Sequence, residues 1–414
     1  MKLKFIIIII GFSILLNDGK ALAQSSSSTN ITKAASVKST NQSVNNGVKP
    51  RATGSQTTIK DLTKAQINYD WPMFLHDPEH TGRYQGLVNK PFAGKLFWSF
   101  PAEGPIDSSP ISHKGVLYFG CDDGRVYALS QKNGNIIWAC EIGQPVKSTG
   151  VVDDSGILII GSEDKNIYAI NINDGKIIWK FETSGRVSAQ GIIVNSNVYL
   201  GSWDGNLYAL DKSTGKLVWK FTGQGRITTA CSYYNGTIYT PNHDGMLYAL
   251  DEKTGNLKWS FKSGGKIYSS VCIKNATLYF GSWDKTFYAL DAETSKVKWK
   301  FKASESFSIS PVCDDKSIYV GCDDLKLYSF DLNDGKLKWK TQIGSPVPLL
   351  SSSPAIVNKM LYMGSSDSNL YAIDTNNGAI KWKFKTQRPI ISSPAISEHG
   401  IAIGSQDGNL YFVN

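Results

Sequence analysis

Residues 201–221 read GSWDGNLYALDKSTGKLVWKF and contain two short strand patterns separated by turn signals. Asp204-Gly205 favours a tight hairpin, because Gly tolerates positive φ and the Asp side chain can bond its own backbone. Residues 206–210 alternate in the manner of a strand, with Tyr and Leu as the large side chains. Thr214-Gly215 marks the next turn, and residues 217–221 form the outgoing strand pattern. The stretch therefore predicts two consecutive antiparallel strands.

The same unit recurs along the chain, most visibly in one tryptophan and one hairpin aspartate per repeat. Successive tryptophans lie 40 to 43 residues apart, at Trp98, Trp138, Trp179, Trp219, Trp259, Trp299, Trp339 and Trp382. The aspartates recur with them, at Asp123, Asp164, Asp204, Asp244, Asp284, Asp324, Asp367 and Asp407. A period near 40 built from about four short strands is typical of a propeller blade rather than of a helical solenoid. The sequence therefore predicts an all-β fold, an eight-bladed β-propeller of four-stranded antiparallel blades over residues 69–414.

The two ends of the repeat region complement each other. Residues 96–100 (LFWSF) match the outgoing Trp strand of a blade, yet no blade precedes them. Residues 390–413 supply three strands of a last blade and stop before its Trp strand. We therefore expect the N-terminal Trp strand to close the eighth blade against the three C-terminal strands, so that no free sheet edge remains.

The repeat also has the spacing of a known family. Ala209, Asp211, Gly215 and Trp219 form a pattern that resembles the tryptophan-docking motif of PQQ-like (quinoprotein-type) propellers, the superfamily that includes BamB-like proteins. The pattern returns in full at Ala249, Asp251, Gly255 and Trp259, and in part at Ala289, Asp291 and Trp299, where Ser295 replaces the Gly. The resemblance implies that the eight periodic tryptophans are docking residues. It also implies that the lead-in from Asp70-Trp71-Pro72 to Tyr84 packs across one opening of the ring.

The N-terminal region differs from the repeats in composition. Residues 1–23 combine Lys2 and Lys4, an apolar run over residues 5–16 and a small-residue ending at Ala21-Leu22-Ala23, which predicts a secretory signal peptide. Residues 24–68 are rich in Ser, Thr, Asn and Lys, which predicts a disordered linker. We expect an exported protein of the periplasm or the extracellular space, without a transmembrane segment in the mature chain. No Cys precedes Cys121, so the lipid-attachment Cys of BamB-type lipoproteins is missing.

The formal net charge of +9 belongs mainly to this N-terminal region. Residues 1–23 contribute +2 and residues 24–68 contribute +5, which leaves +2 for the propeller. A nucleic-acid-binding propeller is therefore not indicated. We interpret the basic tail as a soluble spacer, with weak attraction to an anionic membrane or wall polymer as the alternative.

Six cysteines lie within the repeats, without a CxxC pair or two adjacent Cys. They are Cys121, Cys140, Cys231, Cys272, Cys313 and Cys322. Small buried thiols are one interpretation, and export would permit disulfides of unassigned connectivity.

A second cluster of potential ligands lies in the lead-in, where His76, Asp77, Glu79 and His80 fall within five residues. Pro78 argues against a regular helix that would present both His residues on one face. We therefore favour structural packing over a metal site.

The candidate binding residues lie in loops that the propeller topology brings to one face. Four strands alternate in direction, so the Asp hairpins and the loops from each Trp strand to the next inner strand share a face. Arg186, Arg226 and Lys266 recur every 40 residues in the second set of loops, with Lys147 and Arg388 close to the same position in two other blades. Trp203, His243 and Trp283 precede the hairpin Asp in the third to fifth blades. Together these residues predict a cationic and aromatic binding surface, although pairing with the hairpin aspartates and folding back onto neighbouring loops are the structural alternatives.

Three functions are consistent with these patterns. The resemblance to BamB-like propellers implies a non-catalytic scaffold of the cell envelope that binds a protein partner as a monomer, with a role in outer-membrane protein assembly. The resemblance to quinoprotein dehydrogenases implies PQQ and Ca²⁺ as cofactors, but the adjacent Cys pair common in those enzymes is absent and the inner strands offer few carboxylates. A glycan- or wall-binding propeller that stacks sugars on Trp203 and Trp283 is the third possibility. We favour the scaffold, without catalytic residues, cofactor or metal.

Overall fold

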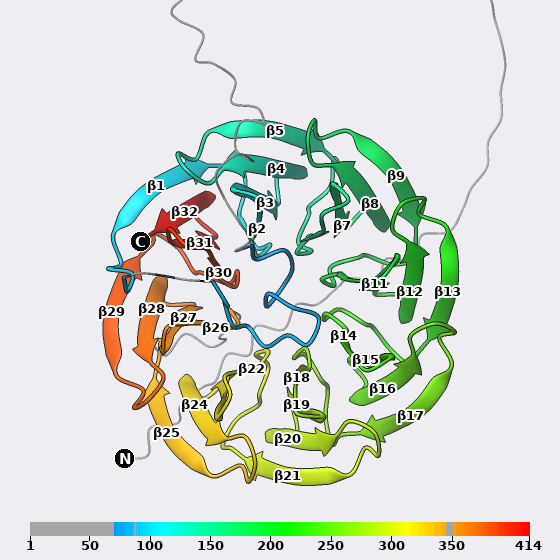
Figure 1. Ribbon diagram of the computed structural model, residues 1–414, viewed down its shortest axis with the longest axis vertical. Helices are drawn as coiled ribbons and strands as arrows, with labels where there is room; N and C mark the ends of the chain where they lie inside the picture. Colours follow the sequence, from blue (N-terminus) through cyan, green and yellow to red (C-terminus); the bar gives the residue numbers. More distant parts are fainter. Residues whose placement is uncertain (1–69, 87, 89, 345–351) are drawn as a thin grey trace, which may run out of the picture. The chain divides into compact units, whose positions relative to one another are not determined.

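The computed structural model describes residues 70–86, 88, 90–344 and 352–414. These residues form eight four-stranded antiparallel sheets arranged around a central axis, as Figure 1 shows. The predicted eight-bladed propeller is therefore confirmed. The predicted signal peptide (residues 1–23) and linker (residues 24–68) lie outside the described residues. Within the described part of the chain, no helix is long and apolar enough to cross a membrane.

Each blade runs outward from a short inner strand to a longer outer strand. The inner strands are β2 (Ile111–His113), β6 (Val151–Val152), β10 (Ile192–Val194), β14 (Ser232–Tyr234), β18 (Cys272–Lys274), β22 (Val312–Cys313), β26 (Ala355–Val357) and β30 (Ala395–Ile396). The second strands are β3 (Val116–Gly120), β7 (Ile157–Gly161), β11 (Asn197–Gly201), β15 (Thr237–Pro241), β19 (Thr277–Gly281), β23 (Ser317–Cys322), β27 (Met360–Gly364) and β31 (Ile401–Gly404). The third strands are β4 (Arg125–Ser130), β8 (Asn166–Asn171), β12 (Asn206–Asp211), β16 (Met246–Asp251), β20 (Thr286–Asp291), β24 (Lys326–Asp331), β28 (Asn369–Asp374) and β32 (Asn409–Val413). The outer strands are β5 (Ile136–Glu141), β9 (Ile177–Glu182), β13 (Leu217–Thr222), β17 (Leu257–Lys262), β21 (Val297–Lys302), β25 (Leu337–Gln342), β29 (Ile380–Lys385) and β1 (Leu96–Pro101).

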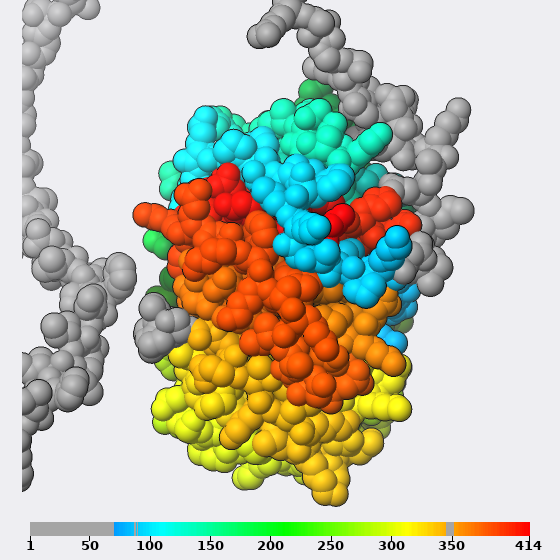
Figure 2. Space-filling model, turned by 90° about the vertical axis from the view of Figure 1, so that its left-hand side faces the viewer, coloured from blue at the N-terminus to red at the C-terminus, as the bar shows by residue number. Residues whose placement is uncertain are grey.

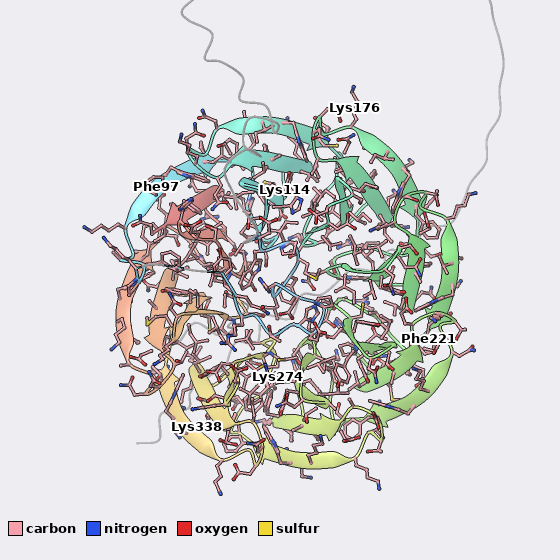
Figure 3. All side chains as sticks on the ribbon, in the orientation of Figure 1. Phe97, Lys114, Lys176, Phe221, Lys274 and Lys338 are labelled. Atoms are coloured by element: carbon pink, nitrogen blue, oxygen red, sulfur yellow. The ribbon has the colours of Figure 1, made fainter. Side chains whose placement is uncertain are left out.

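Burial follows the radial position of a strand. Second and third strands such as β19 and β12 are buried on both faces, because neighbouring blades cover them from both sides. Outer strands such as β21 are largely exposed at the rim. Side chains fill the space between the blades in Figure 3, where Phe97 and Lys176 lie at the rim and Lys114 and Lys274 lie near the inner strands. The core is therefore a ring of contacts between blades rather than one central cluster.

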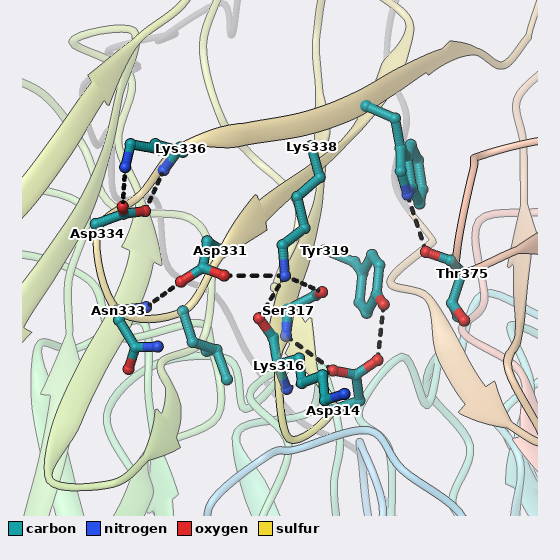
Figure 4. A network of polar contacts seen from close by, with 12 residues as sticks. Asp314, Lys316, Ser317, Tyr319, Asp331, Asn333, Asp334, Lys336, Lys338 and Thr375 are labelled. Carbon is teal, nitrogen blue, oxygen red and sulfur yellow. Dashed lines mark hydrogen bonds and ion pairs between the residues drawn. The ribbon is translucent and has the colours of Figure 1, made fainter.

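The periodic tryptophans join each blade to the next. Trp179 Nε1 donates a hydrogen bond to the carbonyl of Lys212 in the following blade (3.0 Å), and its ring covers Gly215. A Cβ on Gly215, whose φ is +69°, would lie 2.6 Å from that ring, so a side chain at this position would push the ring away. The other docking bonds run from Trp98 to Gln131, Trp138 to Ile172, Trp219 to Glu252, Trp259 to Ala292, Trp299 to Leu332, Trp339 to Thr375 and Trp382 to Phe92. Ser295, the departure from the motif, keeps the positive φ (+58°) of the glycine that it replaces. Figure 4 shows the bond to Thr375 beside Lys338, whose ammonium binds Asp331 (3.1 Å) and Ser317 (2.9 Å) and so ties three strands of one blade together.

The ring closes as the ends of the repeat region predict. β1 pairs antiparallel with β32, and together with β31 and β30 it forms the last blade. Trp98 of β1 stacks on Phe412 of β32, with ring centroids 5.2 Å apart. Figure 2 shows the N-terminal residues in cyan against the red C-terminal residues. The first described strand, β1, is therefore the outer strand of the last blade and closes the ring.

The lead-in crosses the central opening and bonds to the inner strands of several blades. Trp71 exchanges backbone hydrogen bonds with Ser112 of the first blade, and Tyr84 N donates to Ile356 O of the seventh. Between them, the carbonyls of Pro78, Glu79 and Thr81 accept bonds from the fourth to sixth blades. The lead-in thus ties the inner strands together at the opening opposite the Asp hairpins.

The potential metal ligands of the lead-in are used in packing contacts. His80 is fully buried, and its Nδ1 lies 3.0 Å from Ser232 Oγ. Asp77 accepts a hydrogen bond from Thr81 N (2.8 Å) and lies beside His76. Among the described residues, no three His, Cys, Asp or Glu side chains gather in a metal-binding arrangement.

Candidate binding surface at the channel mouth

The propeller topology places the candidate residues on neighbouring loops of one face. Trp203 N donates to Arg186 O (2.9 Å), and Trp283 N donates to Lys266 O (2.8 Å). His243 N donates to Arg226 O (3.0 Å) in the blade between them. Each hairpin residue is therefore held next to the basic residue of the adjoining loop, as the 40-residue spacing predicts.

Trp203 forms the first half of the surface, in contact with two arginines. The guanidinium of Arg226 lies 4.4 Å from the centroid of the Trp203 ring, and that of Arg186 lies 5.3 Å from it. Trp203 Nε1 donates to Ser188 Oγ (2.8 Å), which fixes the orientation of the ring. Both guanidinium groups are thus within cation–π distance of one indole, and both arginines remain exposed.

Tyr268 forms the second half of the surface. It is not among the residues that the sequence predicted for this site. Its ring stacks on Trp283 (centroids 4.6 Å apart) and contacts His243 on the other side of the blade boundary (4.2 Å). Lys266 Nζ lies 5.5 Å from the Trp283 ring, and Trp283 Nε1 donates to Ser308 Oγ (3.0 Å). Positions equivalent to Tyr268 hold small hydroxyl residues in the neighbouring blades. The aromatic residue at this one position is the sequence feature that could have indicated its place in the binding surface. We call residues Arg186, Trp203, Arg226, His243, Lys266, Tyr268 and Trp283 the aromatic–cationic arc.

The histidine of the arc does not contribute to its charge at neutral pH. Burial, followed by the nearby charges of Lys266 and Arg226, lowers the pKa of His243 to about 4. The ring Nε2 lies 2.5 Å from Thr228 Oγ1 and is held by that contact. The positive charge of the arc therefore comes from Arg186, Arg226 and Lys266.

Seven of the eight hairpin aspartates bind a tyrosine, and among the described residues none forms an ion pair with a basic residue of the arc. Asp204 Oδ2 accepts a hydrogen bond from Tyr208 (2.8 Å), four residues later in the same blade. The same Asp–Tyr bond is present at Asp123–Tyr127, Asp164–Tyr168, Asp284–Tyr288, Asp324–Tyr328, Asp367–Tyr371 and Asp407–Tyr411. Arg186 pairs with Glu163 (3.5 Å). Among the described residues, no ion pair joins Arg226 or Lys266 to a hairpin aspartate. The D-x-x-x-Y spacing, visible in every blade of the sequence, was the signal for the aspartates' role.

The other two basic residues near this face lie outside the arc. Lys147 Nζ lies 3.0 Å from both Asp107 and Asp122. Although burial opposes it, hydrogen bonding to these carboxylates raises the pKa of Lys147 to about 12. Arg388 lies in the loop between β29 and β30, which joins the seventh blade to the eighth. The arc is therefore confined to the third, fourth and fifth blades.

A cavity of about 250 Å³ lies in the channel below this mouth. It is lined mainly by hydroxyl side chains such as Ser109, Thr149 and Ser393, together with Phe74 of the lead-in. Ca²⁺ takes six to eight oxygen ligands, among which carboxylates are prominent. Of the described residues that line the cavity, Asp107 is the one carboxylate, and the ammonium of Lys147 already binds it. These residues do not fit a Ca²⁺-dependent quinone site.

The fold and its docking motif define the class of the protein, an eight-bladed propeller with quinoprotein-type repeats. Two family models match: that of the β-propeller of β-alanine-activating enzyme over residues 87–282, and that of outer membrane protein assembly factor BamB over residues 243–414. Together the two models span residues 87–414, so the chain is similar to PQQ-like propellers over its repeat region. No curated protein matches the sequence.

Solved structures resemble the chain in fold. BamB from Moraxella catarrhalis has a TM-score of 0.68 at 16% identity, covering 77% of this chain and 99% of its own. A europium-containing methanol dehydrogenase has a TM-score of 0.71 at 15% identity, covering 84% of this chain and 92% of its own. Quinohemoprotein alcohol dehydrogenase from Comamonas testosteroni has a TM-score of 0.72 at 15% identity, covering 86% of this chain and 82% of its own. Enzymes and an assembly factor thus share this fold, so the site must decide between them.

Proposed function

We propose that this chain is an exported, non-catalytic scaffold of the cell envelope that binds a protein partner through the aromatic–cationic arc. The observation that carries the proposal is the arc itself, three exposed cations held against two tryptophans on three adjacent blades. The match of residues 243–414 to the BamB model supports a role in the assembly of outer-membrane proteins. This match covers four residues of the arc, His243, Lys266, Tyr268 and Trp283.

The composition of the arc suits a protein interface. Trp, Tyr and Arg are the residues in which interface binding energy concentrates, because they bury a large area and keep a polar end. Trp283 is 42% exposed, so the binding of a partner can still remove much of its surface from water. Since the cations lack ion pairs apart from that of Arg186 with Glu163 among the described residues, an acidic partner segment would complement them.

The two alternatives have less support from the arc and the channel. A quinone-dependent dehydrogenase would need metal ligands at the mouth, where Lys147 lies between two carboxylates. A glycan-binding surface would need open faces on Trp203 and Trp283, but Arg226 covers the first ring and Tyr268 stacks on the second.

The test is a capture experiment with the full chain from an extract of bacterial envelopes. We expect Arg186→Glu/Arg226→Glu to reduce capture of the bound partner at least tenfold, because two attractive charges become repulsive. The matched control is Lys176→Glu/Lys336→Glu, in turns on the opposite face with side chains 82% and 83% exposed, which should leave capture unchanged. Equal capture by both variants would contradict the proposal.

A calorimetric titration with PQQ and Ca²⁺ tests the enzymatic alternative directly. We expect no saturable binding and no dye-linked oxidation of alcohols or sugars. Saturable binding with turnover would overturn the scaffold proposal.

A further inference from the structure

Two buried cysteines of adjacent blades meet in the core, away from the arc. Cys272 lies in β18 of the fifth blade and Cys313 lies in β22 of the sixth. Their sulfur atoms are 3.3 Å apart, and both side chains are buried. Among the described residues this is the one sulfur–sulfur contact, since Cys121, Cys231 and Cys322 instead direct their sulfurs toward backbone carbonyls.

The register of the two strands explains why these sulfurs face each other. Cys272 pairs with Tyr279 in its blade, and Val312 pairs with the corresponding Tyr319 in the next. Cys313 is therefore one residue beyond the position equivalent to Cys272. Because successive side chains of a strand point to opposite faces, that single step turns Cys313 back toward the fifth blade.

We propose that Cys272 and Cys313 form a disulfide that links the fifth and sixth blades. The sulfurs must approach by about 1.2 Å to reach the bond length of about 2.05 Å. In the reaction a small-molecule disulfide such as oxidised glutathione is the oxidant. One protein thiolate attacks it and releases one reduced thiol; the second protein thiolate then attacks the mixed disulfide and releases the other. The two cysteines lose two protons and two electrons, and the oxidant gains both pairs as two thiols.

In the folded protein the lead-in binds the backbone of both cysteine strands. Its Glu79 carbonyl accepts a hydrogen bond from Ile273 N (2.8 Å), and its Thr81 carbonyl accepts one from Cys313 N (2.9 Å). Burial, and then the contact with Cys313, raises the pKa of the Cys272 thiol well above its usual range, so the folded protein holds little of the attacking thiolate. The bond therefore forms during folding, before the two thiols are buried, and afterwards resists reduction.

The inference rests on the proposed export for its oxidising surroundings, but its test does not. The full chain is reduced, unfolded and refolded in a mixture of reduced and oxidised glutathione, then unfolded with N-ethylmaleimide and weighed. We expect four adducts on the six cysteines and a linked peptide pair containing Cys272 and Cys313. We also expect a thermal midpoint several degrees above that of the chain refolded in dithiothreitol, and no loss of the link when reductant is added before unfolding.

Two serine variants provide the controls. Cys313→Ser should give five adducts and no linked pair, whereas Cys231→Ser should give three adducts and keep the link. Six adducts on the refolded wild type, or a linked pair other than Cys272 with Cys313, would overturn the inference. Formation of the link by a protein that captures no partner would leave the inference standing and contradict the proposed function alone.

Discussion

Closure of the ring by its two ends predicts a large effect of Phe412→Ala. Phe412 is 1% exposed and stacks on Trp98 of β1, so its side chain joins the C-terminal strand to the N-terminal one. Truncation of a buried Phe to Ala typically costs about 3–5 kcal/mol, from lost burial and the cavity left behind. With an unfolding entropy of about 2.1 cal/mol/K per residue, the propeller has about 0.7 kcal/mol/K, so Tm should fall by about 4–7 °C.

The neighbouring Phe97 supplies the matched control. It lies on the partner strand β1 but is 60% exposed, so Phe97→Ala should cost less than about 1 kcal/mol. Thermal unfolding of both variants, followed by tryptophan fluorescence and by calorimetry, measures the difference. Equal shifts for the two variants, or a shift below 1 °C for Phe412→Ala, would refute closure of the ring through this contact.

Three further predictions concern the rest of the ring. Deletion of residues 404–414 removes β32 and should abolish the cooperative melt of the whole propeller; a truncated chain that melts cooperatively at the wild-type temperature contradicts this. Burial lowers the pKa of His80 to about 4, so the stability that its neutral form contributes should be full above pH 6.5 and fall by about 1.4 kcal/mol per unit as the pH decreases from 6.5 toward 4, in addition to the loss from His243. Urea titrations at pH 7, 6 and 5 should show a shallower dependence for His80→Gln, and equal slopes would refute the role of His80. Tyr208→Phe leaves Asp204 without its phenol donor and should cost about 1–3 kcal/mol in urea titrations, whereas no measurable loss would contradict a stabilising bond.

The blade architecture was predictable because it repeats. A local pattern that occurs once says little, but the 40-residue return of Trp219 and Asp204 indicates how many blades there are and where each begins. The same period placed Arg186, Arg226 and Lys266 on one face. The docking partners of the tryptophans are one blade away, and seven of the eight tryptophan rings lie against a glycine with positive φ, so a similar geometry recurs around the ring.

Contacts that depend on side-chain direction were not predictable in the same way. Whether a hairpin aspartate binds a tyrosine or an arginine depends on differences of a few ångström in the positions of the side-chain ends. The sequence does not give these positions, although the D-x-x-x-Y spacing is present throughout. Tyr268 becomes part of the arc only because its ring turns toward Trp283, which the sequence does not state. The sulfur contact of Cys272 and Cys313 depends on the distance between two blades and on a register offset of one residue.

The most direct test of the proposed function is site-specific photo-crosslinking in intact cells that express the full chain. A benzophenone amino acid replaces Trp283 in the arc in one variant and Lys176 on the opposite face in the other. We predict that irradiation links the variant at position 283 to one discrete envelope protein, and that the link disappears when Arg186→Glu/Arg226→Glu is added. A link formed equally from position 176, or one unaffected by the charge reversal, would contradict the assignment of the arc as the docking surface.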